Sequence, residues 1–257
     1  MADPTKEFDS ARLKVQRAYR HIDELRGMFA NFLKSDFCSL TVDQDPQTGQ
    51  NSIYVASTAS PPPEMALVIG DAVHNLRTAL DHTIVKILGE RGNRESFPVA
   101  KERDNPGAHS TYGVIKKTLP DLAALILEKI EIHDTGNPSI WAVSKIDNFD
   151  KHNLLIPVIS IQELRGFSLK SEGGLLIENC SAGVEDGGRV NIMQMTGQFE
   201  ITNKGHPAAQ ILFGDGQPLV GKPIIESLVK MAELTTQAIN TLETFWVGQG
   251  TKGQAIK

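Results

Sequence analysis

The chain has 257 residues, of which 40% are hydrophobic and 22% charged, and its formal net charge at pH 7 is −5. These proportions are typical of a soluble globular protein. The net negative charge argues against a broad basic surface for binding nucleic acid, but it does not exclude a small, local basic site. No apolar run is long enough to span a bilayer, the first residues do not resemble a signal peptide, and Cys38 and Cys180 match no metal or redox spacing. We therefore expect a cytoplasmic protein that makes no contact with a membrane.

The first third of the chain predicts a helix, a hairpin and a second helix. Apolar residues recur at helical spacing over 8–32, and 38–58 reads as two strands joined by a turn at 45–49. The three prolines at 61–63 end the hairpin and open the second helix, because proline is tolerated in a first helical turn. This helix is predicted to continue to about Leu88.

The rest of the chain predicts a long loop, two shorter helices, a strand-rich region and a final long helix. In chain order these are a surface loop over 93–115, helices over 119–132 and 138–149, short strands over 156–212, a helix over 224–246 and a disordered tail over 248–257.

The order of the elements predicts the α+β fold class. Because a helix returns after the strands, a helical core with an insertion fits better than two domains in tandem. We expect a single domain over 1–257, with an antiparallel helical bundle formed by 8–155 and 222–247. A β-hairpin follows the first helix, and a β-rich insertion of about 156–215 precedes the last one.

Seven polar side chains share one stripe of the helix that is predicted to begin at the prolines 61–63 and to end near Leu88, and aliphatic residues fill most of its remaining surface. The seven are Asp71, His74, Asn75, Arg77, Thr78, Asp81 and His82. At 100° per residue they span an arc of about 160°. A solvated face is normally filled with Lys, Glu and Gln, whereas this one carries the residue types that perform acid–base and ligand chemistry. The stripe is therefore our candidate site.

Within the stripe, Arg77 and His82 are separated by four residues, and the sequence R-T-A-L-D-H resembles the R-x(4–6)-H signature of HEPN-domain ribonucleases. That resemblance implies a helical homodimer that cleaves RNA without a metal ion or cofactor, in a toxin or an anti-phage defence system, with an antitoxin or defence-system partner. By this resemblance, Arg77 would stabilise the negatively charged phosphorane, and His82 would transfer the proton or orient the scissile phosphate. Guanidinium and imidazole suit these roles chemically.

The longer string G-D-A-V-H-N-L-R-T-A-L-D-H, together with Asp150, Lys151 and His152, also resembles a group of bacterial proteins without an assigned activity. In that group the two motifs occur together, which implies that both belong to one site. Lys151 would hold a phosphate, and His152 would supply a second proton-transfer group. We expect Asp71, His74, Asn75 and Asp81 to support the site or bind substrate, and the two motifs to converge in space.

Three other interpretations remain open. The cleft could bind a nucleotide or a small anion without chemistry. The carboxylates and imidazoles of the two motifs could instead form the metal site of a hydrolase, although no H-x-x-x-H or E-x-x-H pattern is present and Arg77 would repel a cation. Finally, the stripe could be a structural network in which Asp81 pairs with Arg77 and Asp150 anchors a histidine of the helix.

Overall fold

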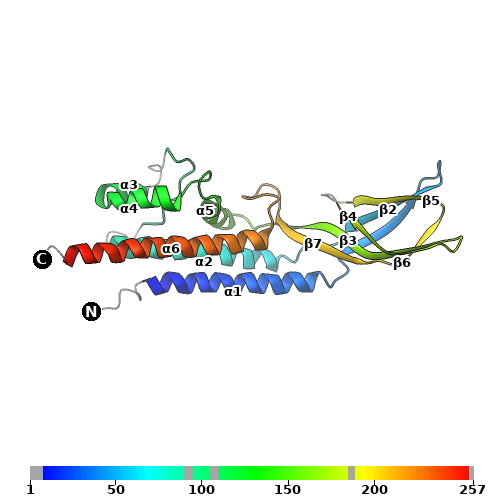
Figure 1. Ribbon diagram of the computed structural model, residues 1–257, viewed down its shortest axis with the longest axis horizontal. Helices are drawn as coiled ribbons and strands as arrows, with labels where there is room; N and C mark the ends of the chain where they lie inside the picture. Colours follow the sequence, from blue (N-terminus) through cyan, green and yellow to red (C-terminus); the bar gives the residue numbers. More distant parts are fainter. Residues whose placement is uncertain (1–7, 90–94, 105–109, 185–188, 255–257) are drawn as a thin grey trace.

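The computed structural model describes residues 8–89, 95–104, 110–184 and 189–254. The described chain is elongated, with its helices gathered in one half and its strands in an arm that extends from one end of them (Figure 1). Both sheets of the arm are antiparallel. The predicted α+β class is confirmed.

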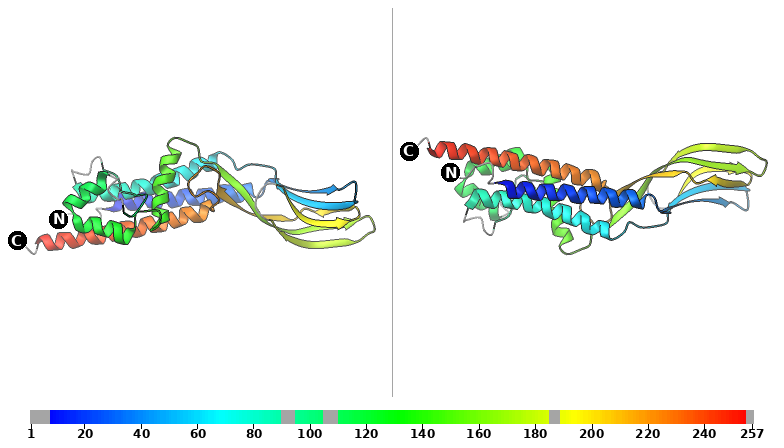
Figure 2. Two further views of the ribbon diagram at one scale, coloured as in Figure 1. Left: turned by 90° about the horizontal axis from the view of Figure 1, so that it is seen from above. Right: turned by 90° about the horizontal axis from the view of Figure 1, so that it is seen from below.

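Three long amphipathic helices form the helical half: α1 (Asp9–Phe32), α2 (Glu64–Leu88) and α6 (Ile224–Gln254). They lie side by side, and α2 and α6 both run antiparallel to α1 (Figure 2). The first two occupy the predicted ranges. Because α6 continues to Gln254, the expectation of a disordered tail is wrong over 248–254, while 255–257 lie outside the described residues. No described helix is both long enough and apolar enough to cross a membrane.

Four shorter helical segments follow α2: α3 (Ser110–Thr118), α4 (Pro120–Leu125), the π-helical turn η4 (Ile126–Ile130) and α5 (Pro138–Asp150). The predicted loop over 93–115 is therefore wrong from residue 110 onward, and 93–94 and 105–109 lie outside the described residues. The single helix predicted over 119–132 is instead divided, and it stops at Glu131 in a left-handed conformation (φ 57°). The helix predicted over 138–149 is confirmed as α5, which begins where Asn137 Oδ1 accepts a hydrogen bond from Ile140 N at 3.1 Å.

The arm joins the predicted hairpin to the predicted insertion. One sheet has the order β1 (Cys38–Gln44), β2 (Gln50–Ser57), β5 (Arg189–Thr196). In the other sheet, β3 (Pro157–Ser171) pairs with β4 (Leu176–Gly183), β6 (Phe199–Asn203) and β7 (His206–Phe213). Because β3 has 15 residues, the expectation of short strands throughout is wrong.

Alternating burial along the strands shows why the two sheets stay together. Ile53 and Val55 of β2 are fully buried, and so are Phe167 and Leu169 of β3. Residues two apart on a strand face the same side, so each strand contributes a row of apolar side chains to the core. The same hydrophobic cluster continues into the helical half, where α5 packs on α2 and α6. This packing brings the end of α5 to the polar stripe of α2.

Candidate functional site at the contact of α2 and α5

Asp147 of α5 is the centre of a polar cluster at this contact. Its side chain is only 3% exposed. One carboxylate oxygen, Oδ1, lies 2.9 Å from His74 Nδ1 of α2, and the other, Oδ2, lies 2.6 Å from Lys151 Nζ. A buried carboxylate is costly unless it is paired, and here both oxygens are paired. The pairing therefore fixes the positions of an imidazole and an ammonium relative to one carboxylate.

His74 combines this buried support with an exposed side chain, 57% of whose surface is accessible. An ionised carboxylate can only accept hydrogen bonds, so Nδ1 of His74 must be the protonated ring nitrogen. The neutral ring then has an unprotonated Nε2. The hydroxyl of Thr78 lies 3.5 Å from this atom but donates its proton to the carbonyl oxygen of His74, at 2.8 Å. Nε2 is therefore able to accept a proton from a bound molecule.

Asp150, the last residue of α5, packs directly on the backbone of α2 at Gly70. A methyl group on Gly70 would lie 2.7 Å from Asp150 Cγ, so an alanine at this position would require the Asp150 carboxyl group to move. Partial burial raises the pKa of Asp150, the nearby charges of Asp147 and Asp71 raise it further, and His74 acts in the opposite direction. We refer to Asp71, His74, Asp147, Asp150 and Lys151 together as the α2–α5 site.

Arg77 and Asp81 form a second arrangement on α2, which binds the peptide backbone at Phe97. Arg77 Nη2 donates to the carbonyl oxygen of Phe97 at 2.9 Å and lies 3.0 Å from Asp81 Oδ1. The same Asp81 oxygen accepts a hydrogen bond from Phe97 N at 2.7 Å. The pairing of Asp81 with Arg77 expected of a structural network is thus present. Arg77 is buried, and within the described residues its Nη1 atom has no hydrogen-bond partner.

Of the three other predicted site residues, Asn75 forms a described hydrogen bond to the α2–α5 site, whereas no described hydrogen bond or ion pair links His82 or His152 to either arrangement. Asn75 donates to the backbone oxygen of Asp71 at 2.8 Å. His82 is half-buried on α2, and His152 is exposed just beyond the end of α5. The structure therefore brings Asp71, His74, Asp150 and Lys151 together, and it separates their contacts from those of Arg77 and Asp81.

Sequence reasoning missed two residues of the site, Asp147 and Gly70. Asp147 precedes Lys151 by four positions and Asp150 by three, so all three lie on one side of α5, and this spacing was the available signal. The expectation that Asp150 anchors a histidine of the helix is wrong, because Asp147 does so. Among the described residues, no three His, Cys, Asp or Glu side chains are placed to hold a metal ion.

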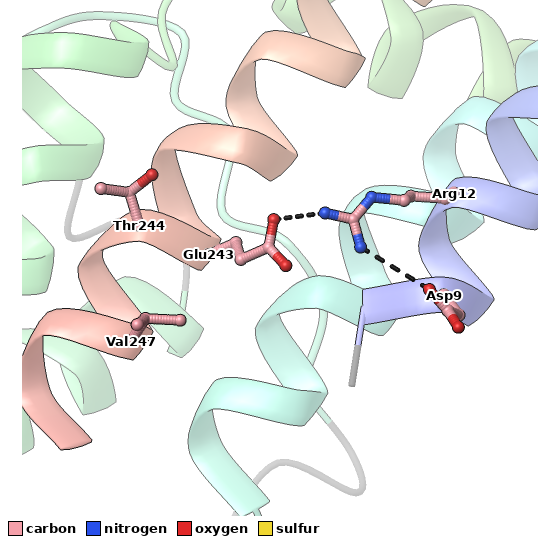
Figure 3. A pocket seen from close by; sticks show the side chains of 5 residues that line it. All are labelled: Asp9, Arg12, Glu243, Thr244 and Val247. Carbon is pink, nitrogen blue, oxygen red and sulfur yellow. Dashed lines mark hydrogen bonds and ion pairs between the residues drawn. The ribbon is translucent and has the colours of Figure 1, made fainter. Parts of the chain in front are cut away.

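A separate hollow lies between the start of α1 and the end of α6 and shares no residue with the α2–α5 site. It is lined by Asp9, Arg12, Glu243, Thr244 and Val247 (Figure 3). The guanidinium of Arg12 forms ion pairs with Glu243 and, at 3.7 Å, with Asp9. The pair of Arg12 with Glu243 connects the two helices at the end that lies opposite the arm.

Comparisons of the chain with protein-family models, with curated proteins and with solved structures find no match. The chemistry of the site has to be inferred from its own residues.

The role of Arg77 in holding Phe97 predicts a large loss of stability in Arg77→Ala. The substitution removes a buried partner of both Phe97 and Asp81, and we expect a cost of about 3–5 kcal/mol in the free energy of unfolding. Arg26→Ala is the matched control, because Arg26 forms an exposed pair with Asp23 at 2.7 Å and should contribute less than about 1 kcal/mol. Urea unfolding measures both. Equal, small losses would contradict a structural role for Arg77.

The close contact of Asp150 with Gly70 predicts an unusual response to Gly70→Ala. Replacing a glycine inside a helix by alanine normally stabilises a protein by about 0.5–1 kcal/mol, but here the new methyl group must displace the Asp150 carboxyl, so we expect destabilisation. In an Asp150→Ala background the normal gain should return. Gly27→Ala in α1, where a methyl group meets nothing within 4 Å, should show the gain directly. Equal gains at both glycines in the unaltered chain would exclude the proposed contact.

Proposed function

We propose that this protein cleaves RNA phosphodiester bonds without a metal ion, and that His74 is the group that accepts a proton in the reaction. The observation that carries the proposal is the exposed imidazole of His74 held by the buried carboxylate of Asp147, which also holds Lys151. The proposed substrate and the proposed homodimer come from the R-x(4–6)-H resemblance. So does the proposed role as a toxin or an anti-phage effector that acts with an antitoxin or defence-system partner.

The α2–α5 site has the groups that cleavage by an internal hydroxyl needs. The ribose 2′-hydroxyl attacks the adjacent phosphorus only as its proton leaves, and a neutral imidazole is suited to take that proton near neutral pH. Asp147 would hold the ring in one tautomer and stabilise it when it becomes positively charged. Lys151, about half exposed and fixed by the same carboxylate, would attract a non-bridging phosphate oxygen as a point charge.

Arg77 and His82 are the residues to which the resemblance assigns the chemistry, and they remain candidates. In our proposal Arg77 acts indirectly, because its guanidinium is bonded to Phe97 and Asp81. His82 lies two turns beyond His74 on the same helix. A homodimer could still bring the half-buried His82 of each copy toward the partner's site.

A second candidate function is binding of a nucleotide or small anion without turnover. The observation that favours it is the half-exposed ammonium of Lys151 beside the exposed imidazole of His74. A protonated imidazole and an ammonium together can hold a phosphate whether or not a proton is then transferred.

The proposal predicts that the wild-type protein degrades single-stranded RNA in the presence of EDTA. His74→Ala should lower the rate by a factor of about 10² or more, which is the usual contribution of a general base. Lys151→Ala should mainly raise KM, because it removes charge that attracts the substrate. His206→Ala, at an exposed histidine on β7, is the matched control and should retain full activity.

Three outcomes would change the conclusion. Inactive wild-type protein that still binds nucleotide would favour the binding function. Loss of activity in His82→Ala but not in His74→Ala would move the chemistry to the residues assigned by the resemblance. A monomeric mass at micromolar concentration, with activity retained, would remove the homodimer from the proposal.

A further inference from the structure

We propose that Asp150 is a second catalytic residue of the α2–α5 site, and that it delivers a proton to the leaving 5′ oxygen. This inference rests on the proposed RNA cleavage. A base alone assists the attack of the 2′-hydroxyl, but the departing alkoxide is a poor leaving group unless it is protonated. The site therefore needs a proton donor as well as His74.

The geometry distinguishes Asp150 from Asp147. Both oxygens of Asp147 are occupied by His74 and Lys151, so this carboxylate is not available to a bound molecule. Asp150 lies three residues further along α5, on the same side of the helix. Within the described residues, its carboxyl oxygens take part in no hydrogen bond or ion pair, although they pack against α2 at Gly70. Asp150 is thus the carboxyl group of α5 that is free to exchange a proton.

The surroundings of Asp150 make its carboxyl group hold a proton more tightly than an isolated aspartate does. The charged and titratable groups that act on it are Asp147 from its own helix and Asp71 and His74 from α2. Burial and the two like charges raise its pKa, and His74 partly offsets them. An acid in catalysis must hold its proton until the leaving group needs it, and proteins meet this demand by placing carboxyl groups in such surroundings.

In the proposed step, the 2′-oxygen forms a bond to phosphorus while its proton passes to Nε2 of His74. The bond between phosphorus and the 5′-oxygen breaks, its electron pair stays on that oxygen, and the proton of the Asp150 carboxyl completes the hydroxyl group. The products are a 2′,3′-cyclic phosphate and a 5′-hydroxyl end. The enzyme is left with a protonated His74 and an ionised Asp150, which exchange protons with water before the next turnover.

A comparison of two substrates tests this assignment. Uridylyl-3′,5′-adenosine has a leaving group that needs a proton, whereas uridine 3′-(4-nitrophenyl phosphate) releases nitrophenolate, which does not. Asp150→Asn should lower the rate on the first by a factor of about 10² or more and leave the rate on the second within a factor of about ten. His74→Ala should fail on both, because both reactions begin with the 2′-hydroxyl. Glu178→Gln, at an exposed residue of β4, is the control and should match the wild type.

The pH profile gives an independent readout. With uridylyl-3′,5′-adenosine, the wild-type rate should fall at high pH as Asp150 loses its proton, and this limb should be absent in Asp150→Asn. Equal losses on the two substrates, or no loss on either, would overturn the role of Asp150 while leaving the proposed function intact. Wild-type protein that is inactive on both substrates would instead overturn the proposed function itself.

Discussion

The negative charge of Asp147 is buried where α5 meets α2, and it has to be balanced there. Removing a carboxylate from water costs several kcal/mol unless donors replace the lost hydration. His74 and Lys151 supply those donors at 2.9 Å and 2.6 Å. Because Asp147 belongs to α5 and His74 to α2, their hydrogen bond joins the two helices and gives the exposed imidazole a fixed direction. The candidate site depends on that one carboxylate.

Two other features of α2 hold its surroundings in place. At Gly70 the missing side chain lets α5 approach closely enough for Asp150 to rest on the helix backbone. About two and three turns further along, Arg77 binds the C=O group of Phe97 and Asp81 binds its N–H group, in the way that a neighbouring strand would. The polar stripe of α2 therefore has two structural roles. Residues at one edge hold a connecting segment, and those facing α5 form the cluster with the raised carboxyl pKa.

The sequence predicted features that depend on local periodicity, and it missed those that depend on distant contacts. The helix over 64–88 and the hairpin at 38–58 follow from spacings of 3.6 and 2 residues, and both are present. The spacing of Asp147 from Asp150 and Lys151 was a signal in the sequence, but its burial depends on a partner 73 residues away, which the sequence does not show. The pairing of Ile53 with Met193 joins residues still further apart in the sequence, so the joining of the hairpin to the insertion was missed. Within α2 the expected pairing of Arg77 with Asp81 is present, whereas the contact of His74 with Asp147 across the two helices was not predicted.

The tautomer of His74 tests the central claim most directly, because the support given by Asp147 requires the ring proton to be on Nδ1. Nitrogen-15 NMR of the imidazole, recorded where the ring is neutral, distinguishes the two tautomers in solution. The account predicts a protonated Nδ1 and an unprotonated Nε2 in the wild type, and loss of this preference in Asp147→Leu. A neutral His74 with its proton on Nε2 in the wild type would contradict the account, because that ring could not donate to Asp147 and would not present a free base to a substrate.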